Sequence, residues 1–379
     1  MAASRPWQPA TRIEERLREA AAKGDEKGYL RALADADLYI YLPKEDVDAG
    51  GSSTWKTFDD ELGNWCIAVC TTGERPPRRA RLVASRTSLR TLAEHWPDAR
   101  FSLYVNPNSP AGMRLRARAW DRRRWKRIAR EADAVTLLTK YTGPRAGDLA
   151  HALGCGAHLS VTNGVLWNEI ADVYHDYEMD VRLLRESWGT STPQDWQREM
   201  NALLAADNSP VGPEFALSVR RELSRESGVP LRPYVWRRAC TALLADLDAP
   251  PEADGEIQEL IGRILRYEAR FRADGLLPPE GYVRSAVGYD YGRAVGFARW
   301  GLSARLCPAE AAEGAILRAG ALCRTAYDSW ADFSAGYAVG RVLRFDTEEF
   351  GEWYENVLTA HRVLMSEPES PWRTIEWAG

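Results

Sequence analysis

The sequence predicts an α+β protein, in which a mixed α/β domain precedes an all-helical domain. β-rich apolar runs alternate with helical patterns only before about residue 165. Beyond residue 169, apolar residues recur every three or four positions, as on the buried face of a helix. The length of 379 residues favours two cores over one. We therefore predict a mixed α/β domain at 1–165 and a helical domain at 166–379, with strands confined to the first.

The first domain is predicted to alternate helices with strands. Two short helices are expected over residues 11–37, separated at Gly24, because apolar residues recur at helical spacing on both sides of the glycine. Apolar runs predict strands at Leu38–Leu42, Trp65–Thr71, Phe101–Val105, Val135–Thr139 and Leu159–Thr162. Helices are expected at residues 88–95 and between the last two strands, and the acidic, glycine-containing segment 43–60 is expected to be an exposed loop.

Eight helices are predicted in the second domain from the spacing of its apolar residues. They cover Pro193–Ala206, Pro213–Ser227, Val235–Ala245, Ile257–Asp274, Tyr289–Arg305, Pro308–Tyr327, Trp330–Phe345 and Glu348–Met365. Thr192 and Asp195 have the spacing of a capping box before the first of these helices, with Pro193 at the favoured first helical position. Ser329 and Asp332 have the same spacing before another.

The composition excludes several classes of protein. The chain is 45% hydrophobic, 27% charged and 10% aromatic, which excludes fibrous and wholly disordered proteins. No apolar run approaches the roughly 18 residues of a membrane span, and the N-terminal residues lack the pattern of a secretory signal. We therefore expect a cytoplasmic protein with no membrane span, whose six scattered cysteines are buried thiols and not a disulfide framework.

The charges are distributed unevenly along the chain. Residues 1–150 hold 27 basic and 20 acidic side chains, whereas residues 151–379 hold 23 and 34, for a net charge of −4. Such an asymmetry indicates an interaction surface. Arginine accounts for 44 of the 50 basic residues, which is typical of a GC-rich bacterial genome, so arginine clusters carry less weight as evidence for binding.

A strand followed by an Asn-Pro turn carries one family resemblance. The segment is Phe101–Arg114 (FSLYVNPNSPAGMR), in which Asn106, Pro107 and Pro110 match the turn that typically follows a strand in the SseB N-terminal domain family. The order of elements before this segment also matches, so residues 11–120 resemble that family. The resemblance implies a mixed α/β domain and, through the family's name, a secretion- or effector-associated role.

Five ordered motifs in the second half carry another resemblance. They are Ser187-Trp188-Gly189, Tyr289-Asp290-Tyr291-Gly292-Arg293 with Trp300-Gly301, Ser329-Trp330-Ala331-Asp332-Phe333, Gly336-Tyr337-Ala338-Val339-Gly340-Arg341 and Ser370-Pro371-Trp372. Over about residues 180–375 the chain is similar to the domain-of-unknown-function 1266 (DUF1266) family, bacterial helical proteins that include the YbeU-type proteins. Tyr289 and Cys307 stand where the family often has Trp and a hydroxyl N-cap. The family has no established activity, so the resemblance implies an architecture and not a reaction.

The sequence contains no motif that predicts a cofactor or a metal. His151, Cys155 and His158 have the only metal-like spacing, but they fall short of the usual four ligands, and glycines flank the cysteine. A phosphate loop, a complete dinucleotide-binding fingerprint and the common hydrolase motifs are absent from the sequence. Because a catalytic triad can assemble from distant residues, an enzyme is not excluded, although the sequence leans towards a non-catalytic protein.

Residues 113–130 form a basic cluster of eight Arg and one Lys around Trp120 and Trp125. Its candidate surface residues are Arg122, Arg123, Arg124, Lys126 and Arg127. Arginine beside stacking aromatic rings is what nucleic-acid binding requires. The favoured interpretation is a solvated amphipathic helix whose Trp and Ile128 face the core. Binding of the cluster to an acidic protein partner ranks between this interpretation and nucleic-acid binding.

Two predicted helices each carry a stripe of aromatic and charged residues on one face. The stripes are Asp290, Arg293, Phe297 and Trp300, and Trp330, Phe333, Tyr337 and Arg341. We expect them to pack face to face around a buried ion pair of Asp290 with Arg293 or Arg341, because nearby glycines indicate a close approach of helices. The alternative is a pocket that binds an anionic group. The candidate binding residues are Trp188, Asp290, Arg293, Trp300, Trp330, Tyr337 and Arg341.

The function favoured by the sequence is a non-catalytic protein–protein interaction module, and a protein partner is therefore expected. The resemblance of the first half implies a secretion- or effector-associated role for this module. The alternative is an enzyme or small-ligand receptor with an anion site near Asp290, Arg293 and Arg341. Nucleic-acid binding through residues 113–130 is third and disfavoured. The identity of the partner and the oligomeric state are left open by the sequence.

Overall fold

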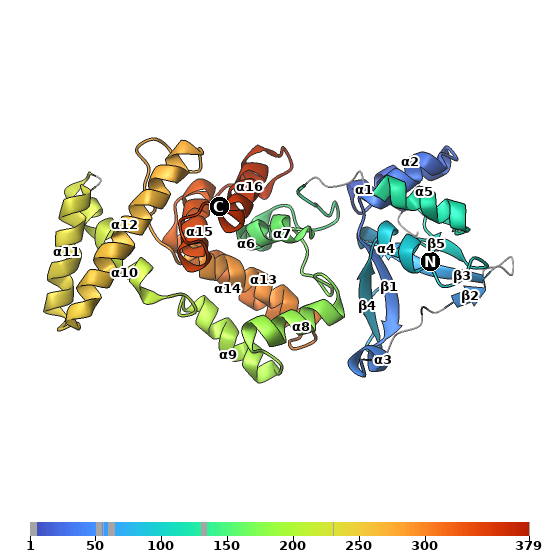
Figure 1. Cartoon of the computed structure of the whole chain (residues 1–379), viewed down its shortest axis with the longest axis horizontal. Coiled ribbons are helices and arrows are strands. Elements are labelled where there is room, and N and C mark those ends of the chain that lie inside the picture. The colour runs from blue at the N-terminus through green and yellow to red at the C-terminus, as the bar shows by residue number, and fades with distance from the viewer. Residues whose placement is uncertain are drawn as a thin grey trace. The chain divides into compact units, whose positions relative to one another are not determined.

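The chain divides into two compact units in the computed structural model (Figure 1). The structure describes residues 6–50, 55, 57–59, 65–129, 135–229 and 231–378. The α/β unit comprises residues 1–143, 171–189 and 302–305, and the helical unit comprises residues 144–170, 190–301 and 306–379. Each unit is therefore built from three segments that are separate in sequence. The predicted boundary at residue 165, between two domains that would each fold independently, remains a proposal.

The α/β unit is built on a six-stranded mixed sheet. Its strands are β1 (Leu38–Pro43), β2 (Thr57–Asp59), β3 (Trp65–Thr71), β4 (Leu82–Thr87), β5 (Ser102–Val105) and β6 (Met113–Arg116). The strand order is β4–β1–β3–β5–β6, and β2 pairs with β3 beside this path. Only the β3–β5 pair is parallel among these, with Ile67 opposite Leu103. All strands in the described residues lie before residue 117, which confirms the predicted α+β class.

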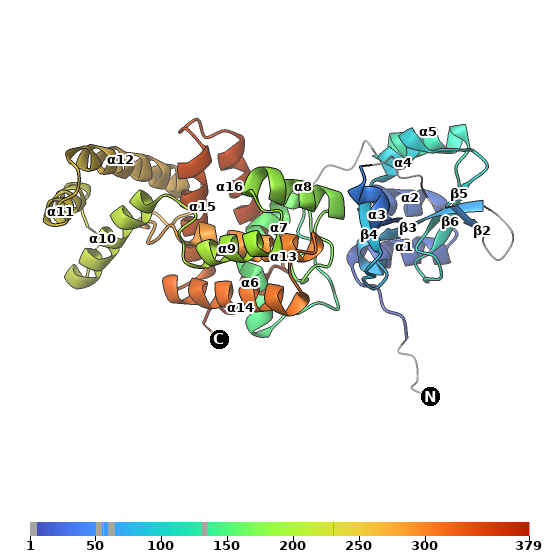
Figure 2. The same ribbon diagram turned by 90° about the horizontal axis from the view of Figure 1, so that it is seen from below.

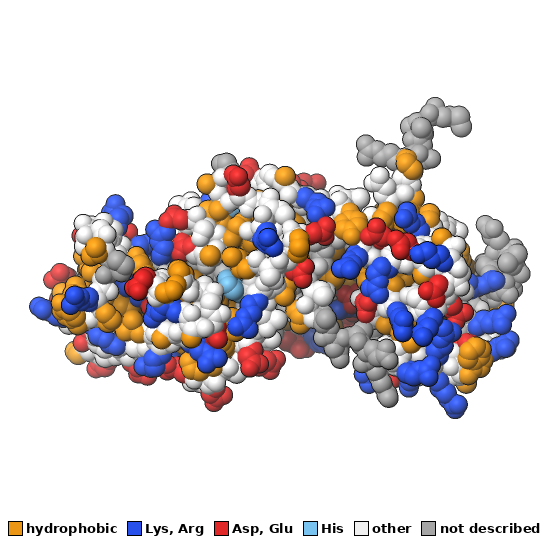
Figure 3. Space-filling model, turned by 90° about the horizontal axis from the view of Figure 1, so that it is seen from above, with side chains coloured by type: hydrophobic (Ala, Val, Ile, Leu, Met, Phe, Trp, Pro, Cys, Tyr) orange, Lys and Arg blue, Asp and Glu red, His pale blue; other side chains and the backbone are white. Residues whose placement is uncertain are grey.

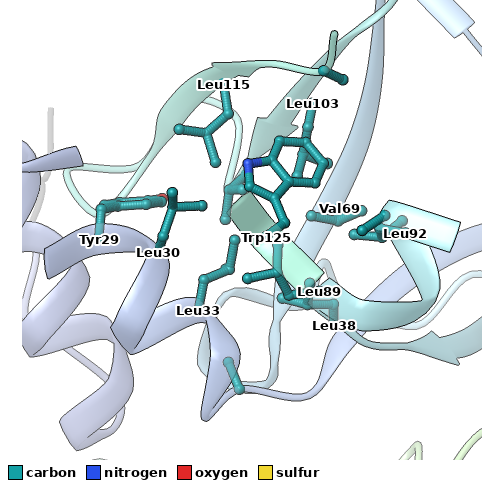
Figure 4. Close-up of a cluster of buried hydrophobic side chains, with 14 of the residues drawn as sticks. Tyr29, Leu30, Leu33, Leu38, Val69, Leu89, Leu92, Leu103, Leu115 and Trp125 are labelled. Carbon is teal, nitrogen blue, oxygen red and sulfur yellow. The ribbon is translucent and has the colours of Figure 1, made fainter. Parts of the chain in front are cut away.

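Four helices cover one face of this sheet. They are α1 (Arg12–Ala22), α2 (Glu26–Ala34), α4 (Leu89–His95) and α5 (Ala119–Ala129). Alternate residues of β1, Leu38, Ile40 and Leu42, join the same buried cluster as the helices, because successive side chains of a strand point to opposite faces. Trp125 of α5 projects into the centre of this cluster, beside Leu33 of α2 (Figure 4). The remaining helices of the unit are α3 (Lys44–Asp48), the 3₁₀ turn η1 (Thr72–Glu74) and α8 (Tyr177–Trp188).

The Asn-Pro turn fastens β5 to β3. The Asn106 Oδ1 atom accepts a hydrogen bond of 2.8 Å from the backbone N–H of Thr71, and Asn106 itself has φ +46°, a conformation that Asn tolerates better than most residues. The Thr71 hydroxyl donates to the buried carboxylate of Glu14 at 2.5 Å. The turn that carries the family resemblance therefore ties two strands to α1.

The helical unit contains eleven helices in its described residues, of which α13 ends in residues assigned to the α/β unit. They are α6 (Gly147–Cys155), α7 (Ala157–Asn163), α9 (Pro193–Leu204), α10 (Val211–Ser227), α11 (Pro233–Asp246), α12 (Pro251–Ala273), α13 (Gly288–Ser303), α14 (Ala309–Ala326), α15 (Trp330–Phe345), α16 (Glu352–Ser366) and α17 (Pro371–Thr374). All eight predicted helices are present. In Figures 1 and 2, α10, α11 and α12 form a separate group within the unit, and each contacts the other two.

The two predicted capping boxes differ in outcome. Thr192 accepts from the backbone N–H of Asp195, whose carboxylate accepts in return from the N–H of Thr192, so this box is complete. Ser329 accepts from the N–H of Asp332, but the Asp332 carboxylate accepts from the N–H of Asp328, one residue further back. The second helix start is therefore capped by a variant of the predicted motif.

Several predicted elements were wrong. Residues 159–162 lie in α7 and not in a strand; because residues 157–161 are all buried, the run lacks the helical period and resembles a strand. Residues 135–139 form no strand. The basic segment starts with β6 before its helix, and β4 was not predicted. The segment 43–60 contains α3 and β2; its residues 51–54, 56 and 60 lie outside the described residues.

No helix within the described part of the chain is long and apolar enough to cross a membrane.

Candidate functional site

The two stripes lie on α13 and α15, which pack closely against each other. A Cβ atom on Gly292 would lie 2.8 Å from the ring of Tyr337, and one on Gly340 would lie 2.5 Å from the Cβ of Tyr289. The rings of Tyr289 and Tyr337 meet edge to face with centroids 5.3 Å apart. Side chains larger than hydrogen at these two glycines would force the helices apart, so the glycines allow the stripes to meet.

Asp290 is fully buried and forms an ion pair with Arg293, one turn further along α13. The backbone N–H of Ser209 donates to the same carboxylate at 3.1 Å, and the Ser209 hydroxyl donates at 2.7 Å. The guanidinium of Arg293 also lies over the ring of Tyr289, 4.2 Å from its centroid. Of the two arginines considered as partners of Asp290, Arg293 therefore occupies that position.

Arg341 on α15 differs from Arg293 because no carboxylate in the described residues lies within ion-pair distance of it. Only 9% of Arg341 is exposed, and its Nε atom is buried with no hydrogen-bond partner in the described structure. Its guanidinium packs over the ring of Trp353 on α16, 5.2 Å from the centroid. A buried cation without a counter-ion is destabilising, so this side chain is suited to bind an anion.

The hydroxyl of Tyr337 is buried next to the guanidinium of Arg341, and no other group among the described residues bonds to it. Burial raises the pKa of Tyr337 above its ordinary value, and the charges of Arg341 and Arg293 oppose this effect. The hydroxyl therefore stays protonated and is a donor at neutral pH. Tyr337 and Arg341 together offer unused donors to one anionic group.

Behind Tyr337, two histidines and a serine form a buried hydrogen-bonded array. His158 of α7 stacks on the Tyr337 ring with centroids 4.3 Å apart. Its Nε2 atom lies 3.0 Å from the hydroxyl oxygen of Ser334, which lies 2.8 Å from Nδ1 of His361 on α16. Since a hydroxyl has one proton, Ser334 donates to one imidazole and accepts from the other.

Both imidazoles of this array are neutral at physiological pH. Burial lowers the pKa of His361 to about 4, with a smaller contribution from the charge of Arg362. Burial also holds the pKa of His158 well below its ordinary value, and the charges of His361 and Arg341 act in the same direction. Because Ser334 is fully buried and bonded on both sides, the array supports the packing of α7, α15 and α16.

An exposed aromatic pair borders Arg341. The rings of Phe345 and Trp353 stack with centroids 5.0 Å apart, and 40% and 44% of these residues are exposed. Arg344 lies over the Phe345 ring, 5.5 Å from its centroid, and donates to the backbone oxygen of Asn208 at 3.0 Å. We call Arg341, Arg344, Phe345 and Trp353 the Arg341 surface; it combines two cations with two partly exposed aromatic rings.

The remaining candidates on the stripes are placed in the core. Trp330 is buried, and its indole N–H donates to the backbone oxygen of Ile375 at 2.8 Å. Trp300 is also buried, on α13. Trp188 ends α8 in the α/β unit and is half-buried. The structure thus brings Asp290, Arg293, Tyr337 and Arg341 into one neighbourhood.

The basic residues of α5 are distributed around an amphipathic helix. Trp125 and Ile128 are buried in the core of the α/β unit, whereas Trp120 is 58% exposed. Arg124 pairs with Glu26, and Lys126 pairs with Glu94. Figure 3 shows Lys and Arg side chains gathered over the α/β unit, with acidic side chains among them. Arg123 and Arg127 are exposed and Arg122 is half-buried; Arg130 lies outside the described residues.

The metal-like spacing of His151, Cys155 and His158 does not bring three ligands together. The Cys155 sulfur lies 3.9 Å from Nδ1 of His151, but His158 turns towards Ser334. No group of three His, Cys, Asp or Glu among the described residues could hold a metal ion.

Sequence reasoning missed the residues that give Arg341 its surroundings. Trp353 and Phe345 come from α16 and the end of α15, and Ser209 comes from the segment before α10. An aromatic residue next to acidic ones at the start of a helix, as in Glu352-Trp353, is the only local signal for Trp353. Ser209 gives none, because its role depends on a contact across 81 residues.

A comparison with known families places the helical part of the chain. The model of the DUF1266 family, described as a protein of unknown function, matches residues 183–377 of the 379. No curated protein and no solved structure matches the chain. The match includes every residue of the Arg341 surface, whereas the resemblance of residues 11–120 to the SseB N-terminal domain family lies outside it and stays a prediction. Because the family model covers more than half of the sequence, the protein belongs to the DUF1266 family.

Proposed function

We propose that the protein is a non-catalytic interaction module whose Arg341 surface binds an acidic segment of a protein partner. The observation that carries this proposal is Arg341, a buried guanidinium with no acidic partner among the described residues. A carboxylate from the partner would supply the missing counter-ion and accept hydrogen bonds from a planar donor group suited to it.

The surroundings of Arg341 support a protein as the source of the carboxylate. Tyr, Trp, Phe and Arg are enriched in protein interfaces, and residues of this kind dominate binding energy when water is excluded around them. Phe345 and Trp353 offer partly exposed rings at the edge of the site, where apolar side chains of the partner can pack. Arg344 adds a second cation, so the surface complements an acidic and apolar segment.

Synthetic peptides test this proposal directly. Peptides that contain Glu between apolar residues, and matched peptides with Gln in its place, are immobilised and incubated with the full chain. We expect the Glu peptides to be retained and Arg341→Gln to weaken binding by about tenfold or more, because one partner of a buried charge pair is lost. Arg318→Gln, at an exposed position of α14, is the matched control and should bind normally. Equal binding of the Glu and Gln peptides would contradict the proposal.

A small-ligand receptor is the second candidate, because Tyr337 adds an unused buried donor beside Arg341. A free anion that binds only the native protein raises its melting temperature, and the rise grows with the ratio of anion concentration to Kd. Phosphate and citrate should then stabilise the full chain more than chloride at the same ionic strength, and Arg341→Gln should abolish the difference. Retention of Glu peptides without any specific stabilisation by small anions favours the protein partner.

The roles of the α/β unit are proposals that rest on the sequence alone. The resemblance of residues 11–120 supports a secretion- or effector-associated partner, and a cytoplasmic location is part of the same proposal. Nucleic-acid binding through α5 remains the disfavoured third function, since Arg124 and Lys126 already have acidic partners. Affinity capture with the full chain and with an Arg122→Ala, Arg123→Ala, Arg127→Ala variant, followed by mass spectrometry and nuclease treatment, separates these partners.

A further inference from the structure

Helices α6 and α14 approach each other closely at a point that neither the family match nor the proposed function explains. A Cβ atom on Gly320 of α14 would lie 2.5 Å from the Cβ of Ala152 on α6, so the two backbones nearly touch there. Cys155 and Cys323 lie three residues beyond this contact on their respective helices, and their thiols are near enough to shift each other's pKa. Both thiols are fully buried.

An imidazole completes this cluster. Nδ1 of His151, one turn before Cys155 on α6, lies 3.9 Å from the Cys155 sulfur. Nε2 of the same ring is buried and has no hydrogen-bond partner in the described residues. The ring packs against Trp330 and Trp377, with centroids 4.8 and 4.9 Å away. The cluster therefore contains two thiols and a group able to accept a proton, in an otherwise aromatic environment.

From this arrangement we propose that Cys155 and Cys323 are a redox-active dithiol, which a hydroperoxide converts into a disulfide between α6 and α14. A disulfide requires Cα atoms about 4.4–6.8 Å apart, a distance that helices reach only where small residues meet, as Gly320 and Ala152 do here. Because Cys155 and Cys323 follow the Ala152–Gly320 contact by three residues on α6 and α14, a small movement of the helices would bring the two sulfur atoms into bonding distance.

The chemistry balances with hydrogen peroxide as the oxidant. Cys155 transfers its proton to His151, and its sulfur attacks one peroxide oxygen, which breaks the O–O bond and releases hydroxide that takes a proton to become water. The Cys323 sulfur then attacks the sulfenic sulfur of Cys155, and the expelled hydroxide leaves as water with the Cys323 proton. Two thiols are oxidised and one peroxide is reduced to two waters.

The electrostatics assign Cys155 as the attacking sulfur. Burial opposes ionisation, but hydrogen bonds from Cys323 and His151 outweigh it and lower the pKa of Cys155 below its ordinary value. Burial and the neighbouring Cys155 raise the pKa of Cys323 well above its ordinary value. Cys323 is therefore the resolving thiol.

Another cysteine pair of the chain serves as an internal control. Cys66 and Cys70 are four residues apart on β3, and at about 3.3 Å per residue their Cα atoms are roughly 13 Å apart, too far for a disulfide. All six cysteines are thiols in the described structure. A specific reaction should consume Cys155 and Cys323 and leave the other four.

The test is peroxide treatment of the folded full chain, followed by thiol counting, intact mass and a peptide map under non-reducing conditions. We expect two of the six thiols to disappear, a loss of two hydrogen atoms in mass and one cross-linked peptide that joins residues 155 and 323, all reversed by dithiothreitol. Six remaining thiols, or a cross-link between other cysteines, would overturn the proposal.

Variants separate the roles of the three residues. Cys323→Ser should retain a sulfenic acid at Cys155 that dimedone traps, whereas Cys155→Ser should leave Cys323 unreactive. His151→Phe should slow loss of the thiols by about tenfold while preserving the circular-dichroism spectrum, and Cys307→Ser should react like the unaltered chain. Trapping at Cys323 in place of Cys155 would contradict the assignment. The map of the unaltered chain decides the disulfide even if a variant does not fold.

Discussion

Two buried arginines of the helical unit have opposite environments. Arg220 on α10 donates to both carboxylate oxygens of Glu268 at 3.1 and 2.5 Å, and to the backbone oxygen of Val283 at 2.7 Å. Trp236 stacks on its guanidinium, 4.1 Å away. Arg341 has an aromatic ring at 5.2 Å in the same way, but no carboxylate among the described residues.

The difference separates a structural arginine from a binding arginine. Glu268 also accepts from the backbone N–H of Val283 at 2.8 Å, so its pair with Arg220 joins α10 and α12 to the segment before α13. The Nε atom of Arg220 is buried without a partner, as that of Arg341 is, but the terminal nitrogens of Arg220 and both oxygens of Glu268 are bonded within the fold. Arg341 differs because no carboxylate among the described residues pairs with its guanidinium, which is the pattern expected where a ligand completes the site.

The largest expected effect comes from removal of the acid beside Arg220. Glu268→Ala leaves a buried cation without its counter-ion, which costs about 3–5 kcal/mol in the free energy of unfolding. Urea unfolding followed by circular dichroism measures this loss. Glu222→Ala, at an exposed acid on the same α10 helix, should change stability by less than about 1 kcal/mol. Equal effects of the two changes would refute the structural role of the pair.

Asp290→Ala is expected to destabilise the protein by about 3 kcal/mol, somewhat less than Glu268→Ala. The change leaves Arg293 without its acid and removes the acceptor for two Ser209 donors, but Arg293 keeps the ring of Tyr289. A melting curve and the soluble yield measure the effect. A stable Asp290→Ala protein would move this carboxylate from the core to the binding site and favour a receptor.

The histidine array makes stability depend on pH next to the Arg341 surface. Above about pH 6.5 His361 is neutral whether the chain is folded or not. As the pH falls below that value the unfolded chain binds a proton, whereas folded His361 does not until about pH 4, so stability falls across this window. His361 alone should reduce the free energy of unfolding by about 2–3 kcal/mol between about pH 7 and about pH 4.5.

His361→Asn isolates this contribution, because Asn places a hydrogen-bonding atom near the position of Nδ1 but does not titrate. The variant should lose less stability than the unaltered chain between the same two pH values, as measured by urea unfolding. An identical pH dependence in both proteins would mean that the imidazole of His361 is charged or solvated in the folded state.

Much of the fold could be predicted because its signals are local. Helical spacing and the Thr192 cap identified the helices of the second half, and β-rich runs identified β1, β3 and β5. The errors occurred where burial is complete or where a strand is short. In α7 every residue from 157 to 161 is buried, so its sequence does not alternate between apolar and polar residues with the helical period. The strand β6 has only four residues and begins a run rich in arginine, which suggested a helix.

The candidate site could be predicted only in part, because its chemistry depends on long-range contacts. Helical spacing placed Asp290 beside Arg293 and aligned Tyr337 with Arg341. It could not show which arginine has the acid, since Ser209 and Trp353 come from segments distant in sequence. Ser334, His158 and Cys323 gave no signal, because each acquires its role from a partner on another helix.

The smallest effect on stability is expected from substitution of Arg341 itself. This effect decides whether Arg341 differs in role from Arg220. Arg341→Met removes a buried charge that has no counter-ion and keeps an apolar side chain against Trp353, so the free energy of unfolding should change by less than about 1 kcal/mol or increase. Arg220→Met is the matched control. It leaves Glu268 buried without its cation and should destabilise the protein by about 3–5 kcal/mol.

Peptide binding should respond in the opposite order. Arg341→Met should abolish retention of the Glu peptides by a protein of unchanged stability, whereas Arg220→Met should reduce stability, and the fraction that remains folded should bind normally. This separation follows from the contacts, because the hydrogen bonds of Arg220 all end on the fold, whereas no carboxylate among the described residues pairs with Arg341. If Arg341→Met unfolds the chain as Arg220→Met does, Arg341 is a structural residue and the Arg341 surface is not a binding site.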